Sequence, residues 1–130
     1  MKMRILVTGG GGFLGRHIVG QLLKAGHAVV AYQRSAHPDL EALGVEVVRG
    51  GLLDNEPLGQ AMRGVEAVIH TAAMAGVWGK AKPYWDANHL GTLAVLRAME
   101  GHGVERLVHC STPSVVFTGE AFEGADEALP

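Results

Sequence analysis

The amino-acid sequence predicts an α/β domain: a doubly wound parallel sheet with the strand order 3-2-1-4-5 and helices on both faces. Short runs rich in Val, Ile and Leu alternate along the chain with segments whose apolar residues recur at helical spacing. Four consecutive glycines separate the first apolar run from the first helical segment. In such a sheet we expect a ligand across the carboxyl ends of strands one and four, where the strand order reverses.

Five short apolar runs are interpreted as strands. Each reads as a stretch of β-branched and other apolar side chains, which is typical of a strand buried on both faces. Such strands are expected at residues 3–8, 28–33, 45–49, 67–71 and 106–110. The residues that follow the last of these runs change character, because residues 118–130 are acidic and lack periodicity. The sequence therefore predicts a folded domain over residues 1–117 and an irregular tail over residues 118–130.

Four helices are expected between these strands. Gly26 and Gly44 stand where the first two helices should end, as residues that accept a left-handed conformation. Asp54 or Asn55 is expected to cap the third helix. The long fourth helix carries apolar residues at helical spacing, and we expect it to leave an apolar stripe uncovered. The helices are expected at residues 13–25, 38–43, 56–63 and 83–102.

Composition narrows the possible classes of function. The 130 residues fit one domain, and a hydrophobic fraction of 48% is enough for a packed core. The net charge of −2 disfavours nucleic acids and anionic membranes as partners, and no apolar run approaches the ~20 residues that span a bilayer. The single cysteine, Cys110, excludes an internal disulfide, and the N-terminus has no secretory cleavage pattern, so a cytoplasmic protein is expected. The seven histidines lack the paired spacing of metal ligands, so no metal site is expected.

The glycine segment indicates a dinucleotide site. Residues 8–15 read TGGGGFLG, between a predicted strand and a predicted helix, which is the context of a Rossmann phosphate loop. The segment satisfies both GxGxxG and TGxxGxxG, and the sequence leaves these two registers open. Residues without a side chain allow a sharp turn and a close approach of the pyrophosphate, which would sit on the free N–H groups of the helix N-terminus.

The residues after strand two bear on the choice of coenzyme. The strand end carries no carboxylate, which would bond a free ribose 2′-hydroxyl and repel a 2′-phosphate. Arg34 is instead expected to pair with that phosphate, and Ser35 to donate a further bond, which favours NADP(H) over NAD(H). In the alternative interpretation Arg34 stacks on adenine and either coenzyme binds. At the end of strand three, Gly51 is expected to offer backbone to the adenine and Leu52 an apolar wall.

Three hydroxyl side chains follow strand five. Ser111, Thr112 and Ser114 are expected at the carboxyl end of a parallel strand, where a hydroxyl can polarise a substrate carbonyl during hydride transfer. The alternative is that these hydroxyls satisfy local backbone groups. Trp78, in the loop after strand four, is expected either to wall a substrate site or to cap the sheet.

Five segments of the chain together carry a family resemblance: TGGGGFLG at residues 8–15, AVIHTAA at 67–73, NHLGT at 88–92, STPSV at 111–115 and DEALP at 126–130. They resemble the extended short-chain dehydrogenase/reductases, the epimerase/dehydratase superfamily. Within that group the chain is most similar to the 3β-hydroxysteroid dehydrogenase branch. More narrowly, residues 73–79 and 111–116 resemble the bacterial 2-alkyl-3-oxoalkanoate reductases of olefin biosynthesis, which reduce a β-keto acid with NADPH.

The resemblance implies roles for individual residues. Thr112 matches the catalytic Ser/Thr of the family, with Ser111 just before it, and Asn88 matches the asparagine that helps to order the active site. Ala72 and Ala73 match the segment beside the coenzyme. Gly51 departs from the family, in which an aspartate is common near the adenine. A homodimer is implied for the intact protein. The residues that match the pyrophosphate loop are Gly9, Gly12, Phe13, Leu14 and Gly15.

The acid–base pair of the family does not occur in this chain. That pair is a tyrosine with a lysine four residues later, but Tyr32 and Tyr84 are followed at that spacing by Ala36 and Asn88. The sequence is therefore interpreted as the N-terminal, coenzyme-binding part of an enzyme, truncated before the last strand and the substrate subdomain and inactive alone. The expected activity is hydride transfer between NADP(H), or NAD(H), and a 3-oxo or 3-hydroxy substrate. The alternatives are a nucleotide-sugar epimerase or dehydratase and a non-catalytic dinucleotide-sensing module.

Overall fold

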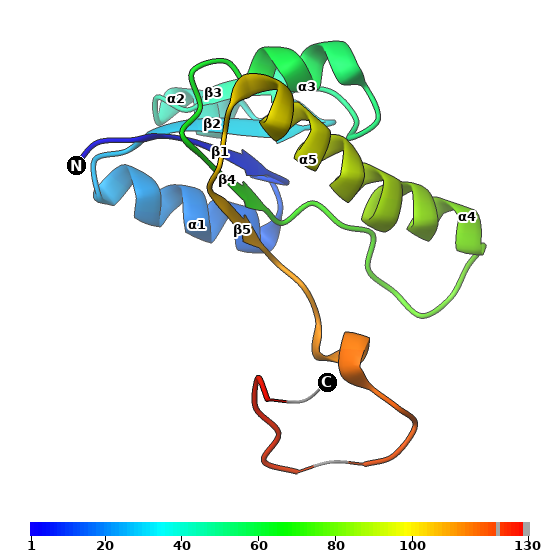
Figure 1. Ribbon diagram of the computed structural model, residues 1–130. Coiled ribbons are helices and arrows are strands. Elements are labelled where there is room, and N and C mark those ends of the chain that lie inside the picture. The colour runs from blue at the N-terminus through cyan, green and yellow to red at the C-terminus, as the bar shows by residue number, and fades with distance from the viewer. Residues whose placement is uncertain (122, 129–130) are drawn as a thin grey trace.

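A parallel five-stranded sheet forms the centre of the molecule. The computed structural model describes residues 1–121 and 123–128, and its strands lie in the order β3-β2-β1-β4-β5 (Figure 1). This arrangement confirms the predicted fold class and strand order. The strands are β1 (Arg4–Thr8), β2 (Ala28–Gln33), β3 (Glu46–Arg49), β4 (Ala67–His70) and β5 (Leu107–His109).

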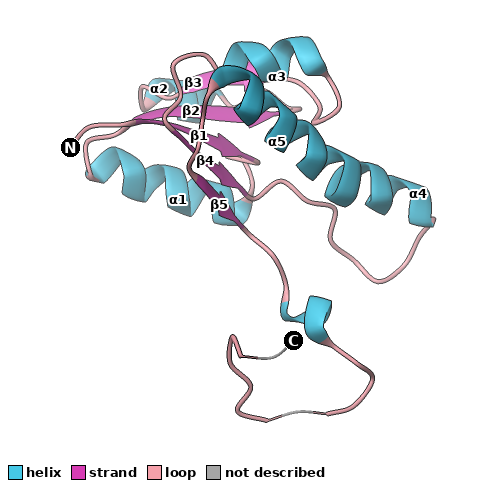
Figure 2. Ribbon diagram, in the orientation of Figure 1, coloured by secondary structure: helices cyan, strands magenta, loops and turns pink. Residues whose placement is uncertain are grey.

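Helices connect the strands and cover both faces of the sheet (Figure 2). Helix α1 lies against one face, and α3 and α5 lie against the other (Figure 1). The bounds of the predicted elements agree with the observed ones to within two residues at each end, apart from the long fourth helix. The helices are α1 (Phe13–Lys24), α2 (Pro38–Ala42), α3 (Asn55–Ala61), α4 (Ala81–Tyr84) and α5 (Gly91–His102), with a π-helix, η1 (Trp85–Leu90), and a 3₁₀ turn, η2 (Pro113–Val116).

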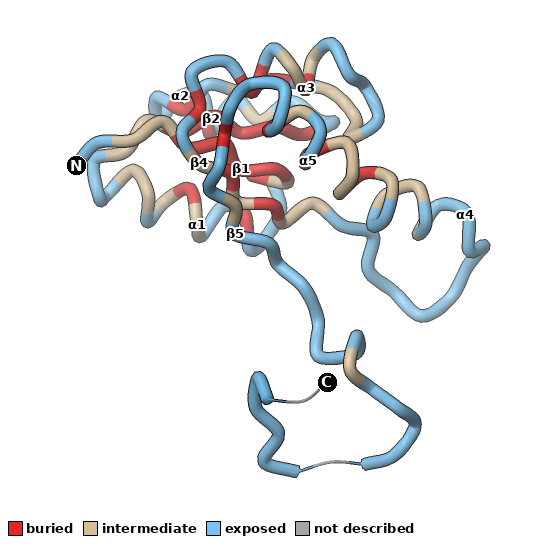
Figure 3. The backbone as a smooth tube through the Cα atoms, viewed as in Figure 1, coloured by how far each residue is buried: buried red, intermediate tan, exposed pale blue. Residues whose placement is uncertain are grey.

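Strands β1 and β2 are mostly buried (Figure 3), and alternating side chains of the sheet pack into two hydrophobic cores. On β1, Leu6 points into the core beneath α3 and α5, whereas Val7 points into the core beneath α1 and α2. Both side chains are inaccessible to solvent. Burying a side chain of this size stabilises a fold by roughly 1.5–3 kcal/mol. The continuous apolar reading of the strands therefore has its cause in a sheet that is covered on both sides.

The strand order reverses at β1, and this places the ligand crevice. Strand β1 pairs with β2 on one side and with β4 on the other, so that Thr8 at its carboxyl end lies opposite both Tyr32 and His70. The two crossovers leave this edge in opposite directions. The glycine turn after Thr8 and the loop after His70 therefore meet at one end of the sheet.

The long helix expected at residues 83–102 is divided by the π-helix η1. The π turn ends where Gly91 passes over Leu52, since a Cβ at position 91 would lie 2.6 Å from the Cδ1 atom of Leu52. The π segment spans only six residues, which is too short for a change of helical period to be recognised in the sequence. The apolar stripe expected on this helix lies beside α3, in a groove that includes Leu53, Leu58, Leu90 and Leu93.

The Asp54 side chain does not cap α3. Asp54 occupies the N-cap position, but one oxygen of its carboxylate turns back and accepts a 2.6 Å hydrogen bond from the N–H of Gly51. The expectation of a side-chain cap at Asp54 was therefore wrong, because the carboxylate closes the preceding turn instead. The alternative cap, Asn55, is the first residue of the helix.

The chain beyond β5 leads away from the sheet (Figure 1). Residues 118–121 and 123–128 contain no helix or strand and are exposed, in keeping with the irregular tail expected there (Figure 3). The DEALP segment that contributed to the family resemblance ends in Leu129 and Pro130, which lie outside the described residues. The boundary expected between residues 117 and 118 stays a prediction.

Candidate cofactor-binding site

The glycine turn leaves β1 and leads directly into α1. Gly9 has a φ angle of +67°, and its N–H donates to the carbonyl oxygen of Tyr32 at 2.9 Å. The N–H of Gly12 then donates to the carbonyl oxygen of Gly9 at 3.0 Å. Helix α1 starts at Phe13 without a side-chain cap. Because the first N–H groups of a helix lack intrahelical acceptors, the amides of the first turn are available to an anion.

Close contacts within the turn account for two more glycines. A Cβ at position 15 would overlap the carbonyl oxygen of Gly9 and lie 2.8 Å from the Cα of Gly10. A Cβ at position 10 would lie 2.8 Å from the Cβ of Ala31 on the neighbouring strand. A Cβ on Gly12 would come no closer to the protein than 3.3 Å, from the Gly9 oxygen. Gly10 and Gly15 therefore allow α1 to pack on the sheet, whereas Gly12 leaves the open side of the turn free of a side chain.

Gln33 ends β2 with an unused acceptor that faces this turn. The side chain is buried, and its Nε2 donates to the carbonyl oxygen of Ser35 at 3.2 Å. Among the described residues, the Oε1 atom of Gln33 finds no hydrogen-bond partner. A Cβ on Gly11 would lie 2.8 Å from this oxygen. A buried acceptor without a partner is costly, so its place beside a side-chain-free turn fits a ligand hydroxyl, such as that of a ribose.

Arg16 ties the segment after β2 to the glycine turn. Its Nε donates to the carbonyl oxygen of Gly11 at 3.0 Å, and its Nη2 lies 2.8 Å from the Nδ1 of His37. Its Nη1 pairs with the carboxylate of Asp39. The hydrogen bond to Arg16 lowers the pKa of the Asp39 carboxyl. One guanidinium thus holds three groups around the open side of the turn.

Hydrogen bonds attach the segment after β4 to the same turn. The buried Thr8 Oγ1 accepts from the N–H groups of Thr71 and Ala72, both at 3.2 Å, and the Thr71 hydroxyl donates to the carbonyl oxygen of Thr8 at 2.7 Å. A Cβ on Gly9 would lie 3.1 Å from the Cα of Ala72. The backbone of residues 71–74 therefore forms one wall of the crevice, with Ala72 beside Gly9.

Asn88 on the π-helix clamps the far end of this wall. Its Oδ1 accepts from the N–H of Met74 at 2.8 Å, and its Nδ2 donates to the carbonyl oxygen of Met74 at 2.9 Å. Both polar groups of the carboxamide are thus committed to the backbone of one residue. Such a pair of bonds orders the segment beside the crevice.

Sequence comparison decides the family. The model described as the NAD dependent epimerase/dehydratase family matches residues 5–129. This chain belongs to that family. It is 49% identical over 113 residues to the 2-alkyl-3-oxoalkanoate reductase of Stenotrophomonas maltophilia, which covers 87% of this chain and 34% of the relative. It is 44% identical over 124 residues to the Shewanella oneidensis protein of the same name, with 95% and 32% covered. The chain spans about a third of the length of these curated relatives.

Other members of the epimerase/dehydratase family are more distant. The 3 beta-hydroxysteroid dehydrogenase/Delta 5-->4-isomerase of Mycobacterium tuberculosis is 37% identical, over 98% of this chain and 36% of the relative. A short-chain dehydrogenase/reductase superfamily protein from Agrobacterium tumefaciens, solved with bound NAD, superposes with a TM-score of 0.84 at 32% identity and covers 98% of this chain and 38% of its own. The NAD complex of a Bacillus cereus UDP-glucuronic acid 4-epimerase gives 0.82 at 30% identity, with 98% and 45% covered.

The residues expected to bind coenzyme lie in different surroundings in this family member. The glycine turn and Ala72 meet as described, and Arg34 and Ser35 are exposed just beyond Gln33. Gly51 is bonded within the protein, since Tyr32 donates its hydroxyl to the Gly51 carbonyl oxygen at 2.6 Å and Asp54 takes its N–H. Burial, followed by the nearby Asp54 charge, raises the pKa of Tyr32 to about 12, so this hydroxyl remains a donor. Leu52 packs partly into the core.

The hydroxyls after β5 lie apart from the crevice. Thr112 caps η2: its Oγ1 accepts from the N–H of Ser114 and donates to the Ser114 hydroxyl, both at 3.3 Å. Ser111 and Thr112 are exposed on the segment that leads away from the sheet (Figure 1). In this structure the Thr112 hydroxyl bonds local groups, and neither it nor Ser111 is brought to the glycine turn. Their catalytic role remains a prediction.

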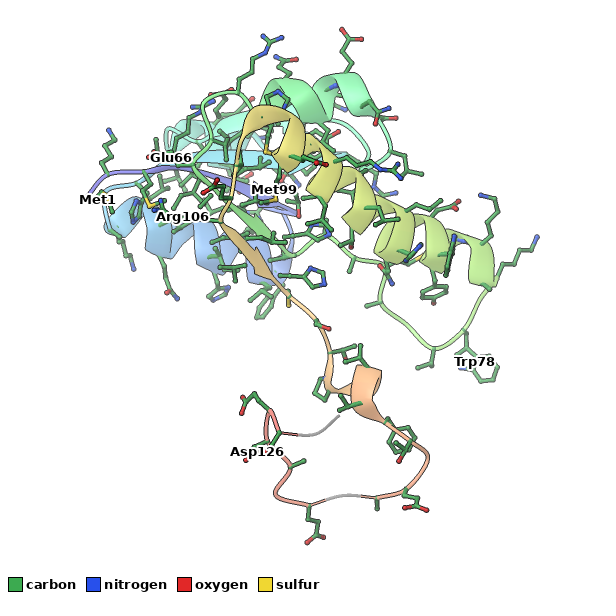
Figure 4. All side chains as sticks on the ribbon, viewed as in Figure 1. Met1, Glu66, Trp78, Met99, Arg106 and Asp126 are labelled. Carbon is green, nitrogen blue, oxygen red and sulfur yellow. The ribbon has the colours of Figure 1, made fainter. Side chains whose placement is uncertain are left out.

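A shallow hollow lies between the loop after β4 and the start of the long helix. It is lined in part by Val77, Trp78, Tyr84, Trp85 and His89. The Tyr84 hydroxyl donates to the carbonyl oxygen of Trp78 at 2.8 Å, which fixes the loop. The Trp78 side chain itself is 88% exposed and points away from the sheet (Figure 4), so it lies at the rim of the hollow and does not cap the sheet.

Sequence reasoning missed three residues that shape the crevice. The sequence shows Gln33 as a polar residue at the end of a strand expected to be buried, but it does not show that the side chain is itself buried, because that depends on packing. Arg16 and His70 lay in a helix and a strand, where single polar residues carry no distinct signal.

Among residues 1–121 and 123–128, no helix is long and apolar enough to cross a membrane, and no three potential metal ligands gather.

Proposed function

We propose that this chain is the coenzyme-binding part of an oxidoreductase that transfers a hydride between NADP(H) and a 3-oxo or 3-hydroxy substrate, either a β-keto acid or a sterol-like molecule. The observation that carries the proposal is the crevice at the β1–β4 switch point, with its glycine turn and the uncharged Gln33 at the end of β2. The names of the two 2-alkyl-3-oxoalkanoate reductases support the substrate class. The nicotinamide coenzyme supplies the hydride when bound.

The residues of the chain fit a dinucleotide in distinct ways. The N–H groups at the start of α1 suit a pyrophosphate, because they and the helix dipole favour negative charge. The Oε1 atom of Gln33 suits an adenosine ribose hydroxyl, which would satisfy the buried acceptor. The backbone of Ala72 and Ala73 suits the other half of the molecule, since Ala72 adjoins Gly9 on the β4 side of the turn.

The charge around β2 supports NADP(H) as the preferred coenzyme. Gln33 stands where a carboxylate would repel a 2′-phosphate, and Arg34 follows it with an exposed guanidinium. Arg49 donates to the carbonyl oxygen of Arg34 at 3.4 Å, which adds a second cation nearby. Asp39, an acidic group near this strand end, is paired with Arg16.

Catalysis is assigned to the intact protein. We propose that Thr112, with Ser111, polarises the substrate carbonyl, and that Asn88 orders the site through Met74. The tyrosine–lysine pair of the family is absent from the sequence, so this chain alone binds coenzyme without turnover. We further propose that the intact protein is a homodimer, and the apolar groove between α3 and α5 is consistent with an interface.

A second candidate is a nucleotide-sugar epimerase or dehydratase. Solved epimerases with bound NAD superpose closely on this chain, which favours this alternative. Such an enzyme returns the hydride to the same sugar and would favour a carboxylate at the end of β2. Gln33 and Arg34 therefore favour the reductase.

Calorimetric titration of the chain with NADP⁺ and NAD⁺ tests the coenzyme assignment. We expect NADP⁺ to bind at least tenfold more tightly, and R34Q to remove most of that preference, because a lost charge-assisted contact costs about 1.5–3 kcal/mol. R63Q makes the same charge change at an exposed arginine beyond α3 and should leave both affinities unchanged. Tighter binding of NAD⁺ by the unaltered chain would refute the NADP(H) assignment.

The substrate class is tested on the intact protein. We expect oxidation of NADPH with a 2-alkyl-3-oxo acid and no interconversion of UDP-glucose and UDP-galactose. The reverse result would establish the epimerase. Measurable NADPH oxidation by the 130-residue chain alone would contradict the assignment of the missing acid–base pair to the rest of the protein.

A further inference from the structure

A buried histidine joins the two segments that form the wall of the crevice. His70, the last residue of β4, is 2% exposed. Its Nδ1 lies 2.6 Å from the hydroxyl of Thr8, and its Nε2 lies 3.2 Å from the hydroxyl of Thr92. Thr8 precedes the glycine turn, and Thr92 is on the first turn of α5. The imidazole thus bridges the end of β1 and the long helix.

The direction of each hydrogen bond follows from the count of available protons. The Thr92 hydroxyl has one proton, which it donates to the carbonyl oxygen of Asn88 at 2.8 Å. Toward His70 the Thr92 oxygen must therefore accept, so the Nε2 of His70 has to be protonated. A proton at Nε2 fixes the polarity of this half of the bridge.

The other half of the bridge is fixed in the same way. The Thr8 oxygen accepts two backbone N–H groups, those of Thr71 and Ala72, so its own proton is free to point at the Nδ1 of His70. The Nδ1 must then be an unprotonated acceptor. A neutral imidazole with its proton on Nε2 satisfies every group in this chain of bonds.

The bonds close into a ring. The ring runs from His70 through the Thr92 hydroxyl to the carbonyl of Asn88, whose carboxamide bonds both backbone groups of Met74. The covalent chain from His70 to Met74 completes it. Thr8 is attached to this ring at the Nδ1 of His70. Residues 71–74 are therefore held at one end by Thr8 and at the other by Asn88, with His70 connecting the two supports.

We propose that His70 is a positioning residue, locked as the neutral tautomer protonated at Nε2. It couples residues 71–74 to the Asn88 turn of the long helix and thereby sets their position beside the glycine turn. The coupling to coenzyme binding rests on the proposed function; the tautomer and the tether do not. The position of residues 71–74 matters because Ala72 lies close to Gly9: a Cβ added to Gly9 would be 3.1 Å from the Cα of Ala72.

The surroundings of His70 favour the neutral ring. Burial, followed by the neighbouring His109, lowers the pKa of His70 to about 4. His109 on β5 stacks on the imidazole with 5.4 Å between ring centroids, and the other two side chains that contact its nitrogens are uncharged hydroxyls. A protonated ring would present a second N–H to Thr8, whose lone pairs are already used.

The tautomer is read directly by ¹⁵N–¹H correlation NMR of the chain at pH 7. We expect the His70 Nδ1 to resonate as an unprotonated, pyridine-like nitrogen and the Nε2 as a protonated one. Protonation at Nδ1, or an averaged pair of shifts, would overturn the proposal. H109Q, which removes the stacked neighbour and no bond of the ring, should leave the His70 shifts in the same tautomeric pattern.

Substitutions at Thr92 test the tether. T92V keeps the shape but removes the acceptor of the His70 Nε2 proton, so we expect faster exchange of that proton with water, faster hydrogen exchange at the Ala72 amide, and binding of NADP⁺ weakened about fivefold, as one lost neutral hydrogen bond predicts. T92S restores the hydroxyl and should rescue all three. Unchanged exchange and affinity in T92V would overturn the positioning role. If the unaltered chain bound neither NADP⁺ nor NAD⁺, the proposed function would fail, while the tautomer and exchange measurements would still decide the tether.

Discussion

A side chain at position 15 would overlap the carbonyl oxygen of Gly9, because α1 passes directly over the turn that leaves β1. The oxygen is fixed, since it accepts the N–H of Gly12. The start of the helix and the end of the strand are thus in backbone contact, and the N-terminus of α1 is held at the mouth of the crevice.

This contact predicts a large effect of G15A on stability. The added methyl group meets backbone atoms that cannot rotate away, so we expect the free energy of unfolding to fall by about 3 kcal/mol or more. Urea denaturation followed by circular dichroism measures it. G20A, on the same helix with nothing within 4 Å of the added Cβ, should instead be neutral or stabilise by up to about 1 kcal/mol. Equal effects of the two changes would contradict the packing argument.

Gln33 offers a test of coenzyme choice. The change Q33E places a carboxylate at the buried acceptor beside Gly11, where a 2′-phosphate is expected nearby. We expect NADP⁺ to bind at least tenfold more weakly and NAD⁺ to bind as well or better, because the carboxylate repels the phosphate and accepts from a free ribose hydroxyl. Isothermal titration of both coenzymes gives the ratio. An unaltered ratio would place the ribose elsewhere.

The low pKa of His70 predicts a pH dependence of stability. Below its ordinary pKa of 6.5 the unfolded chain binds a proton at this residue, whereas the folded chain does so only near pH 4. The free energy of unfolding should therefore be highest above pH 6.5 and fall as the pH is lowered to 4, by about 3 kcal/mol from this group. Denaturation curves of the unaltered chain and H70N, measured across this range, should converge toward pH 4. Parallel curves would rule out His70 as the source.

The contact between Gly91 and Leu52 predicts an energetic coupling. G91A brings a methyl group to 2.6 Å from the Leu52 Cδ1, in a side chain that packs against the core, and should cost about 1–3 kcal/mol of stability. In the L52A background the clashing atom is gone, so the same change should cost less than about 1 kcal/mol. A double-mutant cycle by urea denaturation measures the difference. Additive costs would show that the π turn relaxes independently of Leu52.

The sequence was sufficient for the fold because its signals are local. Apolar runs and the glycine segment identified the strands, their order and the crevice, and β2 was predicted at its observed bounds, Ala28–Gln33. The family resemblance placed the chain correctly among the reductases and epimerases of its family. Ala72 adjoins Gly9, whereas its expected place beside the coenzyme stays a prediction.

The rest depends on packing that no local pattern encodes. The unpaired acceptor of Gln33 exists only because the residue is buried beside Gly11, and the hydrogen bond between His70 and Thr8 joins residues more than sixty positions apart along the chain. Asp54 had two possible acceptor roles, and the backbone turn decided between them. The π-helix is only six residues long and lies within a longer helical pattern, so it became visible only in three dimensions.

The carboxamide of Asn88 imitates a neighbouring strand. It presents to Met74 the same donor and acceptor that the peptide group of an adjacent strand would present in a sheet. These two bonds fix the backbone at Met74, where the segment that follows β4 gives way to the loop of residues 75–80. A substitution in residues 75–80 should consequently act on that loop itself and leave the backbone of residues 71–74 in place.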